Sequence, residues 1–427
     1  MTTPNQTIGI QRWTRVGLVV FISYLIAFAE RSNIGVAAPL IAEDLALDIK
    51  IVGTLLSAFF WGYVLTQVPG GWIAQKLGPV RVVGVALIIA GIASCLTGMI
   101  HDLRALLFVR VILGIAEGVI WPSFAVLFIR WFPGNERGRA VSVAQYALPL
   151  SSVMMAPLAG WMIDHVGWPS MFVLQGIPGI VMGVVFMWLL SDDPATDTRV
   201  SPAEREYILQ NRNKGTSDNA KFSDVLRSPY IWLLGIASFC WIMVIFSFGL
   251  WMPSLIKQHL QGTGNFTLAG SLTAIPFVFG ALSMYLNARF SDRSSYSRGW
   301  FVAIPNTIAG IALLAQHYGP ATLEWSLLMF SIAGAGLYSG AGTWWNWALT
   351  FFPRNNAGTA IGLMNVFASF GGIIGPMAVG YFASGSSPAS SFYILAWSLF
   401  TGAVLIVILI SLNRGRRDVI QPAIAVH

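Results

Sequence analysis

The sequence predicts an all-α membrane protein whose chain crosses the bilayer twelve times, with both termini in the cytoplasm. Three observations support this prediction: the composition, the number of long apolar segments, and the placement of the basic residues. Apolar residues make up 56% of the 427-residue chain and charged residues only 10%, and the mean hydropathy is +0.68. A soluble domain carries about 25% charged residues, so we expect most of this surface to contact lipid.

Twelve apolar segments are long enough to cross the hydrocarbon core, which requires roughly 20 helical residues. The expected spans lie at 16–38, 51–73, 80–100, 104–129, 139–162, 168–190, 230–255, 268–288, 300–318, 324–350, 357–383 and 390–412. A long polar connector separates the first six from the last six, and Ser201, Pro202 and Glu204 have the pattern that begins a short helix within it. The expected division is an N-terminal six-helix bundle over 1–190, a cytoplasmic linker with a short amphipathic helix over 191–229, and a C-terminal six-helix bundle over 230–427.

The basic residues determine the predicted orientation. Of the 25 Lys and Arg residues, twenty fall in connectors on the side of the N-terminus and two, Arg31 and Arg110, lie inside spans. The three on the opposite side are Lys50, Arg104 and Lys257. Because cytoplasmic connectors are enriched in Lys and Arg, we expect both termini in the cytoplasm. The basic residues form no continuous face, so no nucleic-acid partner is expected.

An internal repeat relates the two halves. Segment 131–140 (WFPGNERGRA) and segment 351–360 (FFPRNNAGTA) share five of ten positions, and each joins the fourth and fifth spans of its half. Parallel repeats of six helices are typical of transporters that bind their substrate near the bilayer midplane, between the halves.

Four charged residues lie well inside the predicted spans, all in the first half: Glu30, Arg31, Arg110 and Glu117. Each costs about 3 kcal/mol at mid-bilayer, so such residues usually face an aqueous cavity and pair with one another. Arg110, Gly114 and Glu117 share one helix face. Two guanidinium groups and two carboxylates make a neutral cluster, which an anionic substrate unbalances and a proton rebalances. The alternative is a static ion-pair network that joins the first and fourth spans.

Adjacent residues on a helix point about 100° apart, so Arg31 and Glu30 need not both face the cavity. Arg31 is the stronger candidate for facing it. The second half has no charge inside its spans but is rich in aromatic and amide groups. Its candidate substrate-binding residues are Thr343, Trp345, Asn346 and Asn365. The nearby Trp347 fits a belt of tryptophans at the membrane interface equally well.

Two segments resemble known transporter motifs. Segment 71–81 (GWIAQKLGPVR) resembles the signature of the major facilitator superfamily between its second and third spans. Gln75 stands where that signature usually has an aspartate, which puts the usual charge lock between the bundles in doubt for the first half. The corresponding part of the second half keeps its aspartate, Asp292.

Segment 30–37 (ERSNIGVA) is similar to the first span of the anion:cation symporter family, which includes bacterial carriers of sugar acids and eukaryotic vesicular glutamate and sialic acid carriers. Arg110, Gly114 and Glu117 match the fourth-span pattern of that family, and Tyr63 lies in a similar stretch of the second span.

The resemblance implies a proton-coupled symporter that imports a small organic carboxylate by alternating access, such as a hexonate, hexarate or hexuronate. It implies that Arg31 contacts the substrate carboxylate and that Arg110 is a second anion contact or a gate. Glu117 is then the main proton-coupling residue and Glu30 a second one. The implied remainder of the pocket is Tyr63, Thr343, Asn346 and Asn365. We expect a monomer in a bacterial inner membrane, with no cofactor other than the coupling proton.

Three other functions were weighed. The tryptophan-rich tenth span leaves room for an aromatic carboxylate as substrate. An efflux antiporter for cations is disfavoured by Arg31 and Arg110. A membrane sensor without transport activity is also compatible with the fold. An enzyme is not expected, because the five histidines have no metal-ligand spacing and the chain has no nucleophile elbow.

Overall fold

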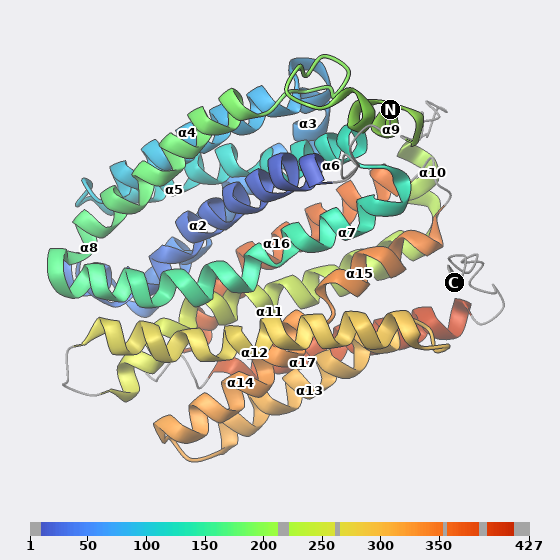
Figure 1. Cartoon of the computed structure of the whole chain (residues 1–427). Coiled ribbons are helices and arrows are strands. Elements are labelled where there is room, and N and C mark those ends of the chain that lie inside the picture. Colours follow the sequence, from blue (N-terminus) through green and yellow to red (C-terminus); the bar gives the residue numbers. More distant parts are fainter. Residues whose placement is uncertain (1–9, 212–221, 261–264, 353–356, 384–390, 414–427) are drawn as a thin grey trace.

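The computed structural model describes residues 10–211, 222–260, 265–352, 357–383 and 391–413, and every regular element in these ranges is a helix (Figure 1). The elements before residue 190 are α1 (Ile10–Arg12), the π-helical turn η1 (Trp13–Gly17), α2 (Leu18–Asp44), α3 (Ile49–Leu77), α4 (Pro79–Thr97), α5 (Leu103–Gly118), α6 (Ile120–Trp131), α7 (Gly134–Gln145) and α8 (Ala147–Leu189). Two short helices follow, α9 (Pro202–Asn211) and α10 (Phe222–Arg227). The remaining elements are α11 (Pro229–His259), α12 (Phe266–Arg293), α13 (Trp300–Tyr318), α14 (Leu323–Ser339), α15 (Ala341–Ala348), the 3-10 turn η2 (Leu349–Phe351), α16 (Ala357–Phe382) and α17 (Phe392–Asn413).

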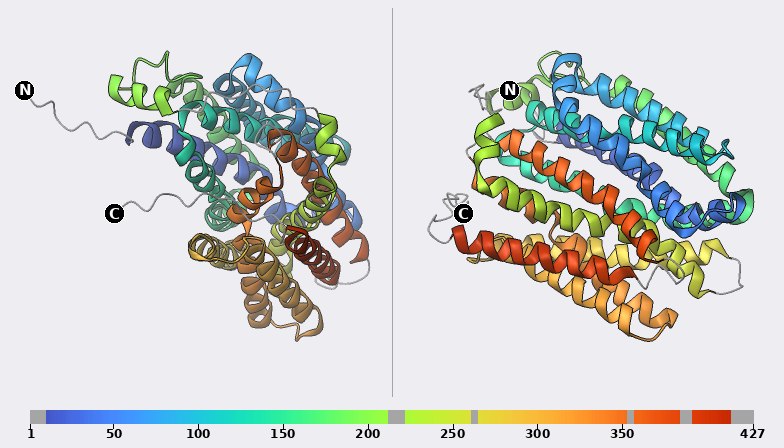
Figure 2. Two further views of the ribbon diagram at one scale, coloured as in Figure 1. Left: turned by 90° about the vertical axis from the view of Figure 1, so that its right-hand side faces the viewer. Right: turned by 180° about the vertical axis from the view of Figure 1, so that it is seen from behind.

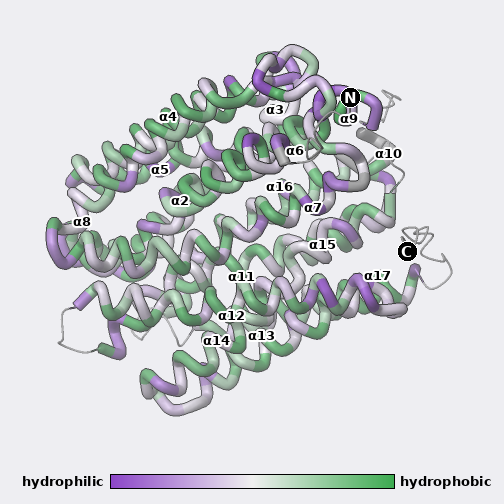
Figure 3. Tube along the Cα trace, viewed as in Figure 1, coloured by the Kyte–Doolittle hydropathy of each residue, from purple (hydrophilic) through white to green (hydrophobic). Residues whose placement is uncertain are grey.

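Within the described ranges, nine helical segments are long and apolar enough to cross a membrane. The long helix α8 is in fact two helices that meet at Gly167, whose φ of 77° and ψ of 161° reverse the chain. Along most helices the hydrophobic residues occupy the middle, and hydrophilic residues concentrate towards the ends (Figure 3).

Three segments predicted as single spans are each divided into two helical elements by one distorted residue that keeps right-handed helical dihedral angles. The segment 104–129 is distorted at Val119, between α5 and α6, and the segment 139–162 at Tyr146, between α7 and α8, and each remains long and apolar enough to cross a membrane as one helix. Pro122 and Pro149 each follow three residues after the break. A proline inside a helix removes one backbone hydrogen bond and its ring clashes with the carbonyl four residues earlier, which explains both breaks. The segment 324–350 is interrupted at Gly340.

The helices gather in two groups, α2–α8 and α11–α17 (Figures 1 and 2). The groups meet along three helix pairs: α2 with α11, α3 with α16, and α8 with α12. Helix α1, helix α9 and the end of α17 lie at the same end of the molecule (Figure 1). We call this the α9 end.

At the end opposite to α9, glycines bring the two groups into backbone contact. A Cβ atom built on Gly53 of α3 would lie 2.8 Å from the carbonyl oxygen of Pro376 on α16. A Cβ atom on Gly160 of α8 would overlap the carbonyl oxygen of Phe266, which begins α12. Only glycine allows this approach, so the two groups form a tight seam here.

A hydrogen-bonded cap strengthens the same seam. The carboxylate of Asp164 on α8 accepts hydrogen bonds from the backbone N–H groups of Phe266 and Thr267, at 2.9 and 2.8 Å. It also accepts one from the Thr267 hydroxyl at 2.7 Å. These N–H groups belong to the first turn of α12, where they have no partner within the helix. One group of helices thus caps a helix of the other.

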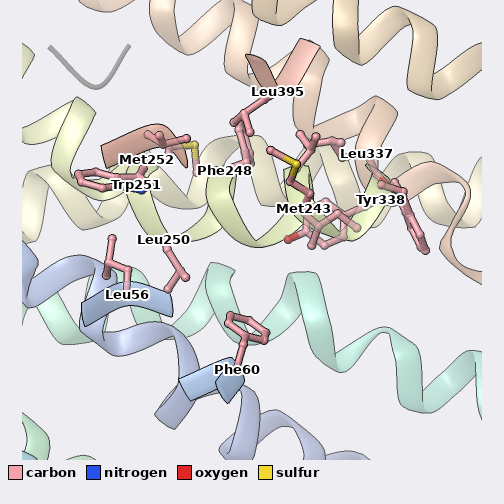
Figure 4. Close-up of a cluster of buried hydrophobic side chains, with 14 of the residues drawn as sticks. Leu56, Phe60, Met243, Phe248, Leu250, Trp251, Met252, Leu337, Tyr338 and Leu395 are labelled. Atoms are coloured by element: carbon pink, nitrogen blue, oxygen red, sulfur yellow. The ribbon is translucent and has the colours of Figure 1, made fainter. Parts of the chain in front are cut away.

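Closer to the middle, the groups meet through apolar side chains. Leu56 and Phe60 of α3 face the helix α11, which carries Met243, Phe248 and Leu250 (Figure 4). All five are buried. Towards the α9 end the packing between the groups is looser: a Cβ atom on Gly342 of α15 would have Ser142 Oγ of α7 as its nearest neighbour, at 3.9 Å.

Helix α9 begins directly after Ser201, whose hydroxyl accepts a hydrogen bond from the Glu204 N–H at 3.3 Å. The helix is held to the first group by Arg12, whose guanidinium pairs with Glu136 of α7 and with Glu204, each at 2.5 Å. Burial alone would lower the pKa of Arg12, but the two carboxylates outweigh it and raise the pKa above its ordinary value.

Candidate functional site

A cavity of about 70 Å³ lies where the two groups of helices meet, near the middle of the molecule. As it stands it has room for only a few water molecules, since each needs roughly 10–15 Å³. Residues of α2, α3, α6, α7 and α8 line one side, and residues of α11, α14, α15 and α16 line the other.

Arg31 is the charged side chain that lines this cavity. Its guanidinium carbon lies 4.6 Å from the ring centroid of Phe28 and 4.7 Å from those of Phe59 and Tyr63. The Phe246 ring of the other group is 5.8 Å away. Aromatic faces attract a cation and shield it from water, so Arg31 is held as a charged group in a mostly apolar surrounding.

Glu117 forms an ion pair with Arg31 but does not itself line the cavity. Its Oε2 atom accepts hydrogen bonds from Arg31 Nη2 at 2.8 Å and from Arg31 Nε at 3.1 Å. The other carboxylate oxygen, Oε1, is buried and has no hydrogen-bond partner among the described residues. Both side chains are at most 5% exposed. The ion pair is therefore buried, with Arg31 at the cavity wall and Glu117 in the second layer.

Arg110 faces the same region but does not line the cavity. Its Nη1 and Nη2 atoms donate to the backbone carbonyls of Glu30 and Arg31, at 3.3 and 3.0 Å. Its Nε has no hydrogen-bond partner in the part of the chain that the structure describes. Arg110 thus fixes the backbone of α2 at the point where Arg31 leaves it.

Glycines on α5 and α3 make this arrangement possible. A Cβ atom on Gly114 would overlap the carbonyl oxygen of Phe59, and one on Gly62 would overlap that of Val111. The two helices therefore cross in backbone contact, which places Phe59 and Tyr63 beside Arg31. Gly114, predicted to share a face with Arg110 and Glu117, is the point of this contact.

Glu30 points away from the cavity. Its carboxylate lies against Gly179 of α8, where a Cβ atom would overlap Oε1. The side chain is 0% exposed, and neither oxygen has a hydrogen-bond partner among the described residues. Of the four charged residues predicted to form one cluster, Arg31, Arg110 and Glu117 lie together, and the Glu30 side chain leaves on a different face of α2.

Of the four substrate-binding residues predicted in the second half, two line the cavity and two do not. Trp345 of α15 and Asn365 of α16 line the cavity, as does the predicted first-half residue Tyr63. Thr343 is buried and Asn346 is exposed, and neither is among the lining residues. The Asn346 amide donates to the carbonyl of Gly342, one turn earlier in its own helix, at 3.1 Å.

Several lining residues were not predicted from the sequence. They are mainly aromatic or amide side chains, namely Tyr24, Phe28, Phe60, Gln145, Trp241 and Phe246. Aromatic residues are common throughout the apolar spans, so nothing in the sequence separates these from packing residues. The exception is Gln145, an amide next to a proline-induced helix break inside an apolar segment.

The site places a cation at the cavity wall and a titratable carboxylate behind it. A buried guanidinium at a cavity wall is a carboxylate receptor. A buried carboxylate on the other side of that guanidinium competes with the anion for it. Among the residues described, the cavity lining holds no carboxylate of its own.

Sequence comparison decides the family. The family model described as "Major Facilitator Superfamily" matches residues 20–376. The chain belongs to the major facilitator superfamily. Solved structures of this superfamily show the same fold: the D-xylose–proton symporter superposes with a TM-score of 0.73 over 92% of this chain and 97% of its own, at 15% identity. An inward-facing bacterial homologue of the human lysosomal transporter Spinster superposes with a TM-score of 0.69 over 94% and 96%, at 19% identity.

Curated relatives cover most of the chain. A protein of Agrobacterium vitis described as a tartrate transporter is 28% identical over 92% of this chain and 89% of its own length. A protein of Escherichia coli K12 described as a galactarate/D-glucarate transporter is 29% identical over 86% of each. Sialin of Ovis aries is 28% identical over 77% of this chain and 68% of its own. This superfamily member is therefore a multi-pass membrane transporter and not an enzyme.

Proposed function

We propose that this transporter is a proton-coupled symporter that imports a small organic carboxylate by alternating access. The observation that carries the proposal is the buried pair of Arg31 and Glu117, with Arg31 at the cavity wall and Glu117 behind it. In this account one guanidinium serves two anions in turn, the Glu117 carboxylate and the carboxylate of the substrate.

The coupling follows from the cost of an unpaired buried charge. Removing one partner of a buried ion pair costs about 3–5 kcal/mol. Protonation of Glu117 removes the countercharge of Arg31, and a substrate carboxylate entering the cavity replaces it. Binding of the proton and binding of the anion then favour each other, while either one alone leaves a buried charge without a partner.

Two further residues complete the charge arrangement. Arg110, with its Nε free of a partner among the described residues, is the proposed second anion contact, which takes the Glu117 carboxylate when Arg31 turns to the substrate. Glu30 is the proposed second protonation site, because its buried carboxyl group has no described partner that would hold a negative charge. The proposed remainder of the pocket is Tyr63, Trp345 and Asn365, with Thr343 and Asn346 outside the cavity in this conformation.

The proposed topology has twelve spans, in an N-terminal bundle (1–190) and a C-terminal bundle (230–427) joined by a linker (191–229). Both termini lie on the cytoplasmic side of a bacterial inner membrane. The excess of basic residues at the α9 end supports this orientation. With the α9 end in the cytoplasm, the glycine seam and the Asp164 cap lie on the extracellular side and hold it closed.

The names of the relatives support a carboxylate as substrate. Tartrate and galactarate or glucarate are organic acids, and sialin is named for an acidic sugar. The resemblance to the anion:cation symporter family implies a sugar acid as that carboxylate.

The test uses Glu117→Gln in proteoliposomes, with Glu43→Gln as the matched control on the exposed end of α2. We expect Glu117→Gln to lose uphill accumulation driven by an inward proton gradient and to keep counterflow exchange, because exchange moves no net proton. Glu43→Gln should keep both activities. Retained uphill accumulation in Glu117→Gln, or loss of counterflow along with it, would contradict the coupling role. Thermal stabilisation by an acid without any exchange in the wild type would favour a sensor.

A further inference from the structure

We propose that the substrate is a monocarboxylate with a flat aromatic body, rather than a sugar acid or a dicarboxylate. The inference rests on the proposed function, since it assumes that the carboxylate binds at Arg31. It is argued from the charge and the chemistry of the cavity wall.

The cavity offers one positive charge. Arg31 is the cationic residue among those that line it, and Arg110 is turned away onto the carbonyls of Glu30 and Arg31. A second carboxylate on the substrate would be taken out of water without a cationic partner in this cavity. Burying an unpaired charge is strongly unfavourable, so the site selects against hexarates and other dianions.

The wall formed by α11 offers no unpaired polar side-chain group to a substrate. It consists of Trp241, Ile242, Ile245 and Phe246, which face the cavity from successive turns of the helix. The only polar atom among these side chains is the Trp241 indole N–H, which already donates to the carbonyl of Leu337 at 2.9 Å. Any hydroxyl of a substrate that is pressed against α11 therefore loses its hydrogen bonds to water and gains none.

This wall separates two classes of carboxylate. A hexonate carries a hydroxyl on nearly every carbon, and these hydroxyls point to both sides of the chain. Each hydroxyl left unpaired against α11 weakens binding roughly tenfold or more. An aromatic ring, by contrast, has two apolar faces and a thin edge, and it loses nothing by lying against an apolar wall.

The cavity surfaces opposite α11 can contact both the faces and the edge of an aromatic substrate ring. The Trp345 indole of α15 lines the cavity together with the aromatic side chains around Arg31. Offset-stacked or edge-to-face contacts between aromatic rings add to apolar burial. Polar side chains also line the cavity away from α11, namely the amides of Gln145 and Asn365 and the hydroxyls of Tyr24, Tyr63, Tyr338 and Ser369. They can hydrogen-bond a substituent on the edge of the ring, such as the hydroxyl of a hydroxybenzoate.

The experiment is calorimetric titration of the purified full-length protein at mildly acidic pH with a matched set of acids. Benzoate and para-hydroxybenzoate represent the proposed class. Cyclohexanecarboxylate has the same size without aromaticity, gluconate is the hydroxylated monoanion, and glucarate is the hydroxylated dianion. We expect the aromatic acids to bind at least tenfold more tightly than gluconate or glucarate. Uptake of the labelled aromatic acid into proteoliposomes, corrected for entry into protein-free liposomes, should then depend on the proton gradient.

The outcomes separate this inference from the proposed function. Tighter binding of gluconate or glucarate, lost in Arg31→Ala, would overturn the aromatic substrate and leave proton-coupled carboxylate import standing. Absence of binding or uptake of every acid in the set would overturn both. Equal binding of benzoate and cyclohexanecarboxylate would overturn the aromatic body in favour of any apolar one.

A pair of tryptophan variants tests the stacking directly. Trp345→Leu should weaken benzoate binding roughly threefold to tenfold while leaving cyclohexanecarboxylate binding nearly unchanged, because the lost aromatic contact affects only the ring. Trp397→Leu is the control, since Trp397 is 61% exposed on α17 and is not among the cavity-lining residues. Equal weakening of both ligands by Trp345→Leu would show that the residue contributes apolar contact alone.

Discussion

At the scale of single residues, Arg31 is the centre of the site. Aromatic faces surround its guanidinium, and one oxygen of Glu117 takes two of its N–H groups. The guanidinium is therefore already desolvated before a substrate arrives, and in the proposed mechanism the substrate carboxylate has only to replace Glu117. A lysine would keep the charge but lose the planar, two-pronged geometry.

Arg31→Ala should abolish substrate-induced thermal stabilisation, and Arg31→Lys should weaken substrate binding by about tenfold or more, because hydrogen bonds to charged groups contribute about 1.5–3 kcal/mol. Binding is measured by calorimetry with the acid that binds the wild type most tightly.

Since Arg31→Ala leaves Glu117 buried without its cation, the double variant Arg31→Ala/Glu117→Gln serves as a folded reference that must also fail to bind. Arg104→Ala, at an exposed position of α5, is the control. Wild-type affinity in either Arg31→Ala variant would exclude the carboxylate contact.

The charged members of the site were predictable because ionisable groups are rare in apolar spans and stand out wherever they occur. Which way each side chain points was not predictable. Trp345 faces the cavity together with Ala341, one turn earlier. Asn346 is one residue from Trp345 and Thr343 is two residues from it, which are rotations of about 100° and 200° around the helix. Their side chains must therefore point away from the cavity. The same geometry sends Glu30 to a different side of α2 from Arg31.

At the scale of elements, the turn inside α8 depends on one backbone conformation. Gly167 has a φ of 77° and a ψ of 161°, a region that side-chain-bearing residues avoid at a cost of about 1–3 kcal/mol. Pro169 follows two residues later, so the chain cannot relax by continuing the first helix. This turn positions the second part of α8, which carries Gly179 against Glu30.

Gly167→Ala should lower the melting temperature of the detergent-solubilised protein by several degrees, since the strain is of the order of 1–3 kcal/mol. Gly138→Ala is the matched control, because Gly138 is helical, exposed and has no atom within 4 Å of an added Cβ. Alanine there should leave stability unchanged or raise it slightly. Equal melting temperatures for the two variants would contradict the assigned strain.

Helix breaks were only partly foreseeable. Pro122 and Pro149 lie inside apolar runs that hydropathy alone merges into single spans, although each proline marks a break three residues earlier. The breaks matter for the site, because Gln145 and Leu148 flank one of them and line the cavity. The break at Gly340 has no proline, and glycine alone does not distinguish a bend from close packing.

At the scale of the whole molecule, the proposed alternating access requires the seam at the end opposite to α9 to open. The glycine contacts keep the two groups together by shape, and the Asp164 cap adds hydrogen bonds that exist only while the seam is closed. We therefore expect Asp164 to bias the proposed equilibrium between inward-facing and outward-facing states.

Asp164→Ala should shift this equilibrium towards the outward-facing state roughly fivefold, because a lost helix cap costs about 1 kcal/mol. The readout is the labelling rate of Thr273→Cys, a buried position near the seam on α12, by a membrane-impermeant maleimide added from outside. Asp102→Ala is the control: Asp102 caps α5 by accepting from the Ala105 N–H at 2.9 Å, within one group of helices. The same labelling rate in both variants would contradict the gating role of Asp164.

The pairing of the halves was predictable from the internal repeat, since two similar six-helix units are expected to pack face to face. The conformational state was not predictable, because the same sequence must populate both states and their free energies differ by little. Contacts such as that of Gly53 with Pro376 belong to one of these states, so no sequence pattern marks them.

The most direct test of the account is the number of protons taken up when the substrate binds. It is measured by calorimetric titration of the wild type and Glu117→Gln in buffers of different ionisation enthalpy. We expect the wild type to take up close to one proton per carboxylate bound near neutral pH and Glu117→Gln to take up none while still binding, because linkage ties the two events to the same buried group. No proton uptake by the wild type, or equal uptake by both proteins, would contradict proton coupling through Glu117.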